Sequence, residues 1–197
     1  SASEPSSLRV LSDGAYAMSF SFSEDSVTNP EHTYVKIFNA NGTVRNDGVR
    51  VDNLPINNTG TSAVAAHSDG GFTVFFMVNN SKSNSSLDFD DIIGQRFDKN
   101  GIKIDGNFRV NTKVHELDQR NVDVTELSNG NNLVYWHSVS SFTTAAGGYS
   151  NEFRASLYSP AGKLLKSDFS LGDTFGSDVQ SIGASDIAAL SNGGFAF

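Results

Sequence analysis

Residues 62–78 read SAVAAHSDGGFTVFFMV, in which two apolar runs are joined by the polar stretch SDGG at 68–71. After this stretch, Phe72, Val74 and Phe76 occur at every second position, which is the period that a half-buried β-strand requires. An Asp-Gly pair between two such runs favours a tight hairpin of type I′, in which both central residues take positive φ. The stretch therefore predicts two antiparallel strands connected by a short turn.

The same turn occurs four times along the chain. Its Ser-Asp-Gly or Ser-Asn-Gly sequence ends at Gly14, Gly70, Gly130 and Gly193, which gives intervals of 56, 60 and 63 residues. Self-similarity at a nearly fixed period is the signature of a repeat architecture. The sequence thus contains three similar units and the first half of a fourth.

Apolar residues occupy matching positions in the three complete units. A second turn ends in glycine at Gly42, Gly101 and Gly162. Two sets of aligned residues are Phe20, Phe76 and Trp136 after the first turn, and Phe38, Phe97 and Tyr158 before the second. Each unit reads as four strands, which is the pattern of a propeller blade. We predict an all-β, β-propeller-like array of four-stranded antiparallel blades with about three and a half repeats, and other stacked antiparallel β repeats are the alternative.

The repeat also predicts the organisation of the chain. We expect one repeat domain over residues 1–197, divided into blade 1 at about 6–53, blade 2 at about 60–112, blade 3 at about 119–172 and a partial blade 4 at about 180–197. Because closed propellers have four blades or more, we expect either a piece of a longer protein or association through the incomplete fourth blade.

Unit 2 contains a more specific pattern, with SDGGF at 68–72, DIIGQRFDKNG at 91–101 and FRVNT at 108–112. These motifs resemble a repeat of large secreted bacterial proteins, the adhesins and haemolysin-type calcium-binding proteins of type I secretion. Units 1 and 3 keep the apolar positions of that repeat and lack most of the polar ones. The resemblance implies a propeller-like module that is secreted or located at the cell surface. The glycine-rich calcium nonapeptides of that family are absent from this sequence, so their calcium chemistry is not implied.

Composition excludes several classes of partner. The 197 residues have a net charge of −8, which argues against nucleic acid, since nucleic-acid binding requires a basic stripe. No apolar run is long enough to predict insertion into a membrane. The chain has no cysteine, which excludes a disulfide framework.

The long connections between strands are predicted to share one face of the array, opposite the tight turns. Loops on a rigid scaffold often carry binding residues, so we expect a ligand on this loop face. Aromatic side chains there could stack on sugars. The candidate ligand-binding residues are Tyr149, Phe142 and Asn84. Trp136 is expected in the core, because it occupies the position of Phe76.

One loop also gathers carboxylates, at Asp88, Asp90 and Asp91. Carboxylate and amide oxygens are the ligands that Ca²⁺ prefers, so the three are candidate metal ligands. Their spacing is not that of an EF-hand, and a solvated acidic loop is the alternative interpretation. The four histidines are His32, His67, His115 and His137; none has metal-site spacing, so we expect them in surface or strand-packing roles.

The functional prediction is a non-enzymatic, secreted propeller module for adhesion or for binding a glycan or protein through the loop face. No G-x-S-x-G sequence, P-loop or cysteine nucleophile is present. One alternative is a polysaccharide-active hydrolase or lyase, because a propeller can collect paired carboxylates from several blades. The other alternative is a structural spacer in a larger surface protein.

Overall fold

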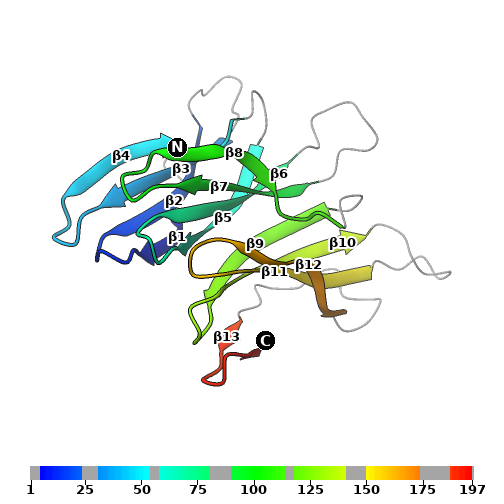
Figure 1. Cartoon of the computed structure of the whole chain (residues 1–197). Helices are drawn as coiled ribbons and strands as arrows, with labels where there is room; N and C mark the ends of the chain where they lie inside the picture. The colour runs from blue at the N-terminus through cyan, green and yellow to red at the C-terminus, as the bar shows by residue number, and fades with distance from the viewer. Residues whose placement is uncertain are drawn as a thin grey trace.

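Four-stranded antiparallel sheets make up most of the chain (Figure 1). The computed structural model describes residues 5–23, 31–53, 58–79, 90–113, 118–140, 150–173 and 187–196. The first sheet, which we call blade 1, has its strands in sequence order. These strands are β1 (Pro5–Val10), β2 (Tyr16–Ser23), β3 (Glu31–Phe38) and β4 (Val44–Arg50).

Two further sheets repeat this arrangement, and a short hairpin follows them (Figure 1). Blade 2 consists of β5 (Asn58–Ala66), β6 (Phe72–Asn79), β7 (Asp91–Phe97) and β8 (Lys103–Arg109). Blade 3 consists of β9 (Asp118–Glu126), β10 (Asn132–Ser140), β11 (Ser150–Tyr158) and β12 (Leu164–Asp173). The terminal hairpin consists of β13 (Ala188–Ala189) and β14 (Phe195–Ala196). The prediction of an all-β array of four-stranded antiparallel blades is confirmed. None of the described segments is a helix that could span a membrane.

Successive blades pack face to face. We call the face of a blade that points to the next blade its forward face, and the opposite one its back face. The forward face of blade 1 and the back face of blade 2 share one buried cluster. Blade 1 contributes mainly Ala15, Ala17, Val35 and Ile37, and blade 2 contributes mainly Phe72, Val74, Phe76 and Phe97. Large rings therefore fill the space over a face of smaller side chains.

The next two contacts repeat this packing. Trp136 on the back face of blade 3 is fully buried against the forward face of blade 2, as the repeat predicted. Ile187 and Phe195 of the terminal hairpin pack on the forward face of blade 3. Burying a large apolar side chain contributes on the order of 2 kcal/mol, so these inter-blade clusters hold the array together.

The first strands of the three blades lie next to one another along the inner side of the array. Arg9 on β1 connects them, because its guanidinium donates hydrogen bonds to two carbonyl oxygens. Nε donates to Val64 O on β5 at 3.3 Å, and Nη2 donates to Val124 O on β9. One cationic side chain thus links all three blades.

The repeated Ser-Asp/Asn-Gly sequence forms the turn between the first two strands of each unit. At its first occurrence, Gly14 N donates to Leu11 O, Leu11 N donates to Ala15 O, and Asp13 Oδ1 accepts from Ala15 N. Only the glycine has positive φ, at 80°. The predicted type I′ turn is therefore wrong, and the loop has the three-residue form in which a turn with negative φ precedes a left-handed glycine.

Three residues of the DIIGQRF segment of β7 have structural roles within blade 2. Phe97 stacks on Phe72 with ring centroids 5.0 Å apart. Gln95 is fully buried, and its Nε2 donates to the carbonyl oxygens of Ile104 and Asp105, where β8 is irregular. The ring of Phe108 lies directly over Gly94. The motif thus describes how a blade is built.

Substitution of Gly94 by alanine should destabilise the fold. The new Cβ would lie 2.4 Å from the Phe108 ring, which would have to leave its edge-on contact with Phe75. We expect a loss of about 1–3 kcal/mol in the free energy of unfolding, measured by urea denaturation. The matched control is Gly106→Ala on β8, where nothing lies within 4 Å of the added Cβ. Equal effects of the two substitutions would contradict this account.

Candidate functional site

The loop face is the end of the array at which β7 and β9 begin. Asp90 and Asp91, two of the predicted metal ligands, stand at the start of β7 and are both largely buried. Asp88 and the predicted ligand-binding residues Tyr149, Phe142 and Asn84 lie outside the described residues, so their roles stay predictions.

Asp91 connects the start of β7 to the end of β8 and to a residue that follows it. Its Oδ1 accepts a hydrogen bond from Asn111 Nδ2 at 2.8 Å, and its Oδ2 pairs with Arg109 Nη2 at 2.8 Å. Asn111 Oδ1 in turn accepts from Ile92 N at 3.0 Å. Blade 1 has an equivalent contact, because Asp52 Oδ2 accepts from Thr33 N at 3.0 Å. Asp91 therefore helps to fix the strand ends.

Asp90 belongs to a different group of side chains, which joins blade 2 to blade 3. Arg120 on β9 lies between two carboxylates, with Nε 3.6 Å from Asp90 Oδ2 and Nη2 2.7 Å from Asp118 Oδ2. The backbone holds the same junction, since Gln119 N donates to Asp90 O at 2.9 Å. We call Asp90, Asp118 and Arg120 the loop-face cluster. The side chain of Arg120 is 49% exposed and that of Asp118 is 32% exposed, so a ligand can reach both.

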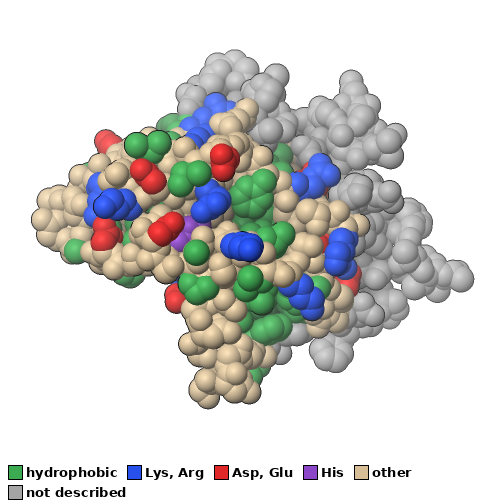
Figure 2. Space-filling view, viewed as in Figure 1, with side chains coloured by type: hydrophobic (Ala, Val, Ile, Leu, Met, Phe, Trp, Pro, Cys, Tyr) green, Lys and Arg blue, Asp and Glu red, His purple; other side chains and the backbone are tan. Residues whose placement is uncertain are grey.

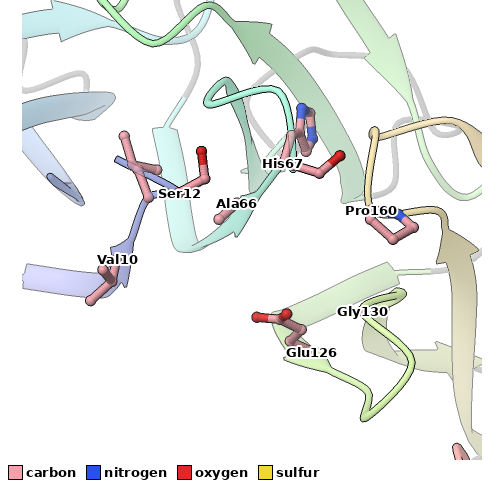
Figure 3. Close-up of a pocket in the computed structure, with 9 residues that line it drawn as sticks. Val10, Ser12, Ala66, His67, Glu126, Gly130 and Pro160 are labelled. Atoms are coloured by element: carbon pink, nitrogen blue, oxygen red, sulfur yellow. The ribbon is translucent and has the colours of Figure 1, made fainter. Parts of the chain in front are cut away.

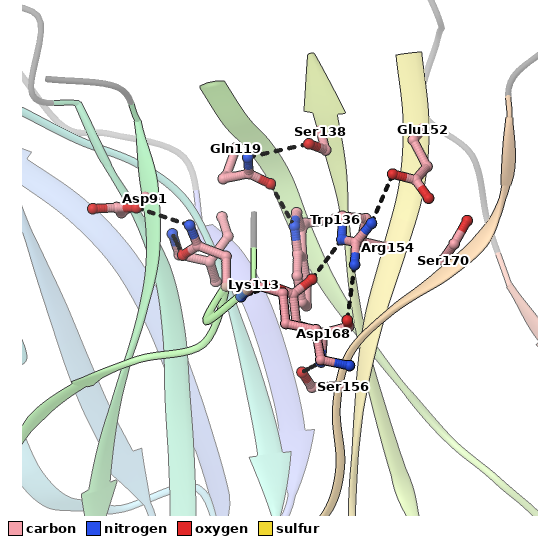
Figure 4. A network of polar contacts seen from close by, with 12 residues as sticks. Asp91, Lys113, Gln119, Trp136, Ser138, Glu152, Arg154, Ser156, Asp168 and Ser170 are labelled. Carbon is pink, nitrogen blue, oxygen red and sulfur yellow. Dashed lines mark hydrogen bonds and ion pairs between the residues drawn. The ribbon is translucent and has the colours of Figure 1, made fainter. Parts of the chain in front are cut away.

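A buried polar layer supports this cluster (Figure 4). Gln119 is fully buried, its Oε1 accepts from Trp136 Nε1 at 2.7 Å, and its Nε2 donates to Ser138 Oγ at 3.1 Å. Buried polar groups that are all paired fix one arrangement of their neighbours. The backbone that carries Asp118 and Arg120 is therefore held firmly by its own strand and by β10.

A second polar group supports the outer part of blade 3 (Figure 4). Arg154 on β11 donates from Nη1 to Glu152 Oε2 at 2.7 Å and from Nη2 to Asp168 O at 2.8 Å. Asp168 also accepts from the backbone N of Lys113, which follows blade 2. This group ties blades 2 and 3 together at the loop face.

The described residues contain no group of three His, Asp or Glu side chains arranged to hold a metal ion. Asp90 and Asp91 have different partners, Arg120 and Arg109 respectively. A cation at either carboxylate would have to compete with the guanidinium already present. The calcium prediction depends on Asp88 and stays a prediction.

His137 on β10 lies at the same end of blade 3. Its ring is largely buried against Phe153, at a centroid distance of 5.5 Å, and its Nε2 has no hydrogen-bond partner within the described structure. Burial lowers the pKa of His137, and the nearby Arg120 charge lowers it further. We therefore expect a neutral imidazole at pH 7. The predicted strand-packing role of the histidines fits His32, His67 and His137, which are all buried.

Charges of both signs lie close together on the side of the molecule shown in Figure 2. Figure 2 shows Lys and Arg side chains interspersed with Asp and Glu on the side of the molecule that it presents. The net charge of −8 is therefore not gathered into one acidic field on this side.

A cleft of about 270 Å³ lies at the opposite end of the array, where the first strands end (Figure 3). Its lining residues include Ser12 of blade 1, Ala66 and His67 of blade 2, and Glu126 and Pro160 of blade 3. His67 Nε2 contacts Thr73 Oγ1 at 3.0 Å, and Ser68 N donates to Pro160 O at 2.7 Å. The His67 ring also lies against Gly162 of blade 3, so His67 is part of the contact between blades 2 and 3.

The fold resembles known structures of longer proteins. The α-L-arabinofuranosidase Arb93A from Fusarium graminearum matches with a TM-score of 0.56 at 11% identity, over 83% of this chain and 48% of that chain. A protein of unknown function from Dyadobacter fermentans matches with a TM-score of 0.59 at 10% identity, over 91% and 43%. Zg3597, a family 117 glycoside hydrolase from Zobellia galactanivorans, matches with a TM-score of 0.50 at 11% identity, over 83% and 54%.

This chain thus spans about half the length of each of these proteins. At such low identity, the likeness shows a shared propeller fold and nothing finer. No family model matches the sequence, and no curated protein matches it either.

Of the loop-face cluster, the sequence predicted Asp90 alone, as a candidate metal ligand, and its placement of the site on the loop face stays a prediction. It missed Arg120, Asp118 and Gln119. The available signal was the polar run DQRN at 118–121, immediately before the apolar alternation of β9. A strand that begins with several polar residues next to a long connection is a good candidate for a site.

The buried state of His67 predicts a loss of stability in acid. Burial lowers its pKa from 6.5 to about 4, while Asp69 acts in the opposite direction. Between these two values the unfolded chain binds a proton that the folded chain does not, so stability falls as pH decreases from 6.5 to 4. The full loss from this residue is about 3 kcal/mol.

The check is urea denaturation of wild type and His67→Gln at pH 7 and pH 4.5. Glutamine does not titrate, so we expect the variant to lose less stability than wild type over this interval. The same loss in both proteins would show that His67 does not carry the effect.

Proposed function

We propose that this chain is a polysaccharide-active propeller module, a hydrolase that binds its glycan on the loop face. One observation supports this above all: two carboxylates from neighbouring blades, Asp90 and Asp118, approach the same guanidinium of Arg120 at this end of the array. The likeness in fold to an arabinofuranosidase and to a family 117 glycoside hydrolase supports the same substrate class.

Glycoside hydrolysis uses two carboxyl groups, one that protonates the leaving oxygen and one that acts as base or nucleophile. The loop-face cluster offers such a pair with different surroundings. Asp90 is only 6% exposed, whereas Asp118 is 32% exposed, so the two carboxyl groups differ in their access to solvent. Arg120 and the backbone can hold sugar hydroxyls beside them.

A second candidate function is glycan binding without hydrolysis, as in an adhesion module of a secreted or cell-surface protein. The position of Arg120 favours it, since its guanidinium pairs with both carboxylates, an arrangement that suits hydrogen bonding to a ligand more than proton transfer. Charged carboxylates and a guanidinium are good partners for sugar hydroxyls, and such a site needs no proton donor.

The test measures binding and hydrolysis separately on a panel of polysaccharides that includes arabinan. Hydrolysis is followed by the release of reducing ends, and binding is followed by affinity electrophoresis. We expect Asp118→Asn and Asp90→Asn each to reduce hydrolysis about 10²–10⁴-fold. The control is Asp47→Asn, which removes an exposed carboxylate on β4 away from the cluster.

The outcomes separate the two functions. Binding that depends on Arg120 and Asp118, without release of reducing ends, would support the adhesion function and overturn the hydrolase. If no polysaccharide binds, or if all variants bind equally well, the loop-face cluster is not a glycan site.

A further inference from the structure

The back face of blade 1 has the composition of a protein core, yet no other blade of the described structure covers it. Its side chains come from β1, β2 and β3 and alternate with those that face blade 2. The apolar ones are Leu8, Val10, Tyr16, Met18, Phe20, Phe22, Tyr34 and Phe38. Lys36 shares this face, with its Nζ 5.7 Å from the centroid of the Phe38 ring. Leu8 is 59% exposed and Phe22 is 40% exposed.

The repeat shows what this face is built to contact. Phe20 corresponds to Phe76 and Trp136, and Leu8 corresponds to Val64 and Val124. The four residues in blades 2 and 3 are almost fully buried. In both cases the cover is the forward face of the preceding blade. Because the back face of blade 1 carries the same kinds of apolar side chain, it fits the forward face of another blade of this repeat.

An exposed forward face exists at the other end of the described chain, on the terminal hairpin. Leu190 occupies the position of Leu11, His67 and Leu127, which are 3%, 4% and 5% exposed, yet Leu190 is 41% exposed. Ala188 and Ala196 lie on the same face and are exposed too. The hairpin already packs Ile187 and Phe195 on blade 3, so its other face is the forward one.

We propose that copies of this chain associate head to tail, with the forward face of the terminal hairpin of one copy covering the back face of blade 1 in the next. The contact continues the existing series of blade-to-blade interfaces and follows their pattern of large rings on small side chains. The occupant is thus a second copy, recognised by Ala188, Leu190 and Ala196. Because two different surfaces meet, the contact is heterologous.

A heterologous contact gives a specific result with two complementary variants. Leu190→Asp places a charge on the forward face of the terminal hairpin and leaves the back face of blade 1 intact. Phe22→Asp places a charge on the back face of blade 1 and leaves the hairpin intact. Wild type should form particles heavier than the 21.1 kDa chain, measured by light scattering over a range of concentrations. Each variant alone should associate at least about tenfold more weakly. An equimolar mixture of the two should recover a dimer, since one intact surface of each kind remains.

Ile102→Asp serves as the matched control, because Ile102 is 65% exposed in the turn between β7 and β8 and lies on neither face. It should leave the mass of the wild-type particle unchanged. Circular dichroism checks that all variants remain folded. A monomeric wild type at every concentration would overturn the proposal. So would variants that associate like wild type, or a mixture that stays monomeric.

Discussion

The packing of one sheet face on the next is the constraint on which this structure depends. Each blade has two apolar faces, so a blade alone would expose both of them to water. Phe72 and Phe76 of blade 2 share a buried cluster with Ala15 and Ala17 of blade 1, and Trp136 of blade 3 is buried against blade 2 in the same way. Stability therefore comes from the contacts between neighbours, as in other repeat proteins. The inner link through Arg9 adds polar contacts from blade 1 to both other blades.

Polar residues of the repeat provide hydrogen-bond partners at the ends of the strands. Strands end in backbone groups that need partners, and the side chains of Asn111 and Asp52 supply them, while Asp91 accepts a hydrogen bond from the Asn111 side chain. The loop-face cluster is built directly beside these residues, where β7 and β9 begin. A site at the strand ends is held in place by the blades. Its polar residues do not weaken the core, because the apolar clusters lie between the sheets. The buried contact between Gln119 and Trp136 joins the two regions.

The sequence predicted the fold well, because a period of two and a repeat of about sixty residues are local patterns that survive without any knowledge of tertiary contacts. The candidate site was predicted less well. Asp90 and Asp91 were grouped as metal ligands because they are adjacent in sequence, but neighbouring residues of an extended chain point in different directions. Asp91 turns to Arg109, while Asp90 meets Arg120 of the next blade. Such a contact between units is set by how the blades pack, and the spacing within one unit does not contain it.

The edges and the faces of this array differ in how they are protected. The outer strands β4, β8 and β12 have interrupted registers and include residues with positive φ, namely Gly48, Asp105 and Asp168. Such irregularities disfavour the addition of another strand at an open edge. The back face of blade 1 has no comparable protection, since its aromatic residues lie on regular strands. The proposed head-to-tail contact joins faces and not edges, so it keeps every new contact in the geometry that the repeat already uses.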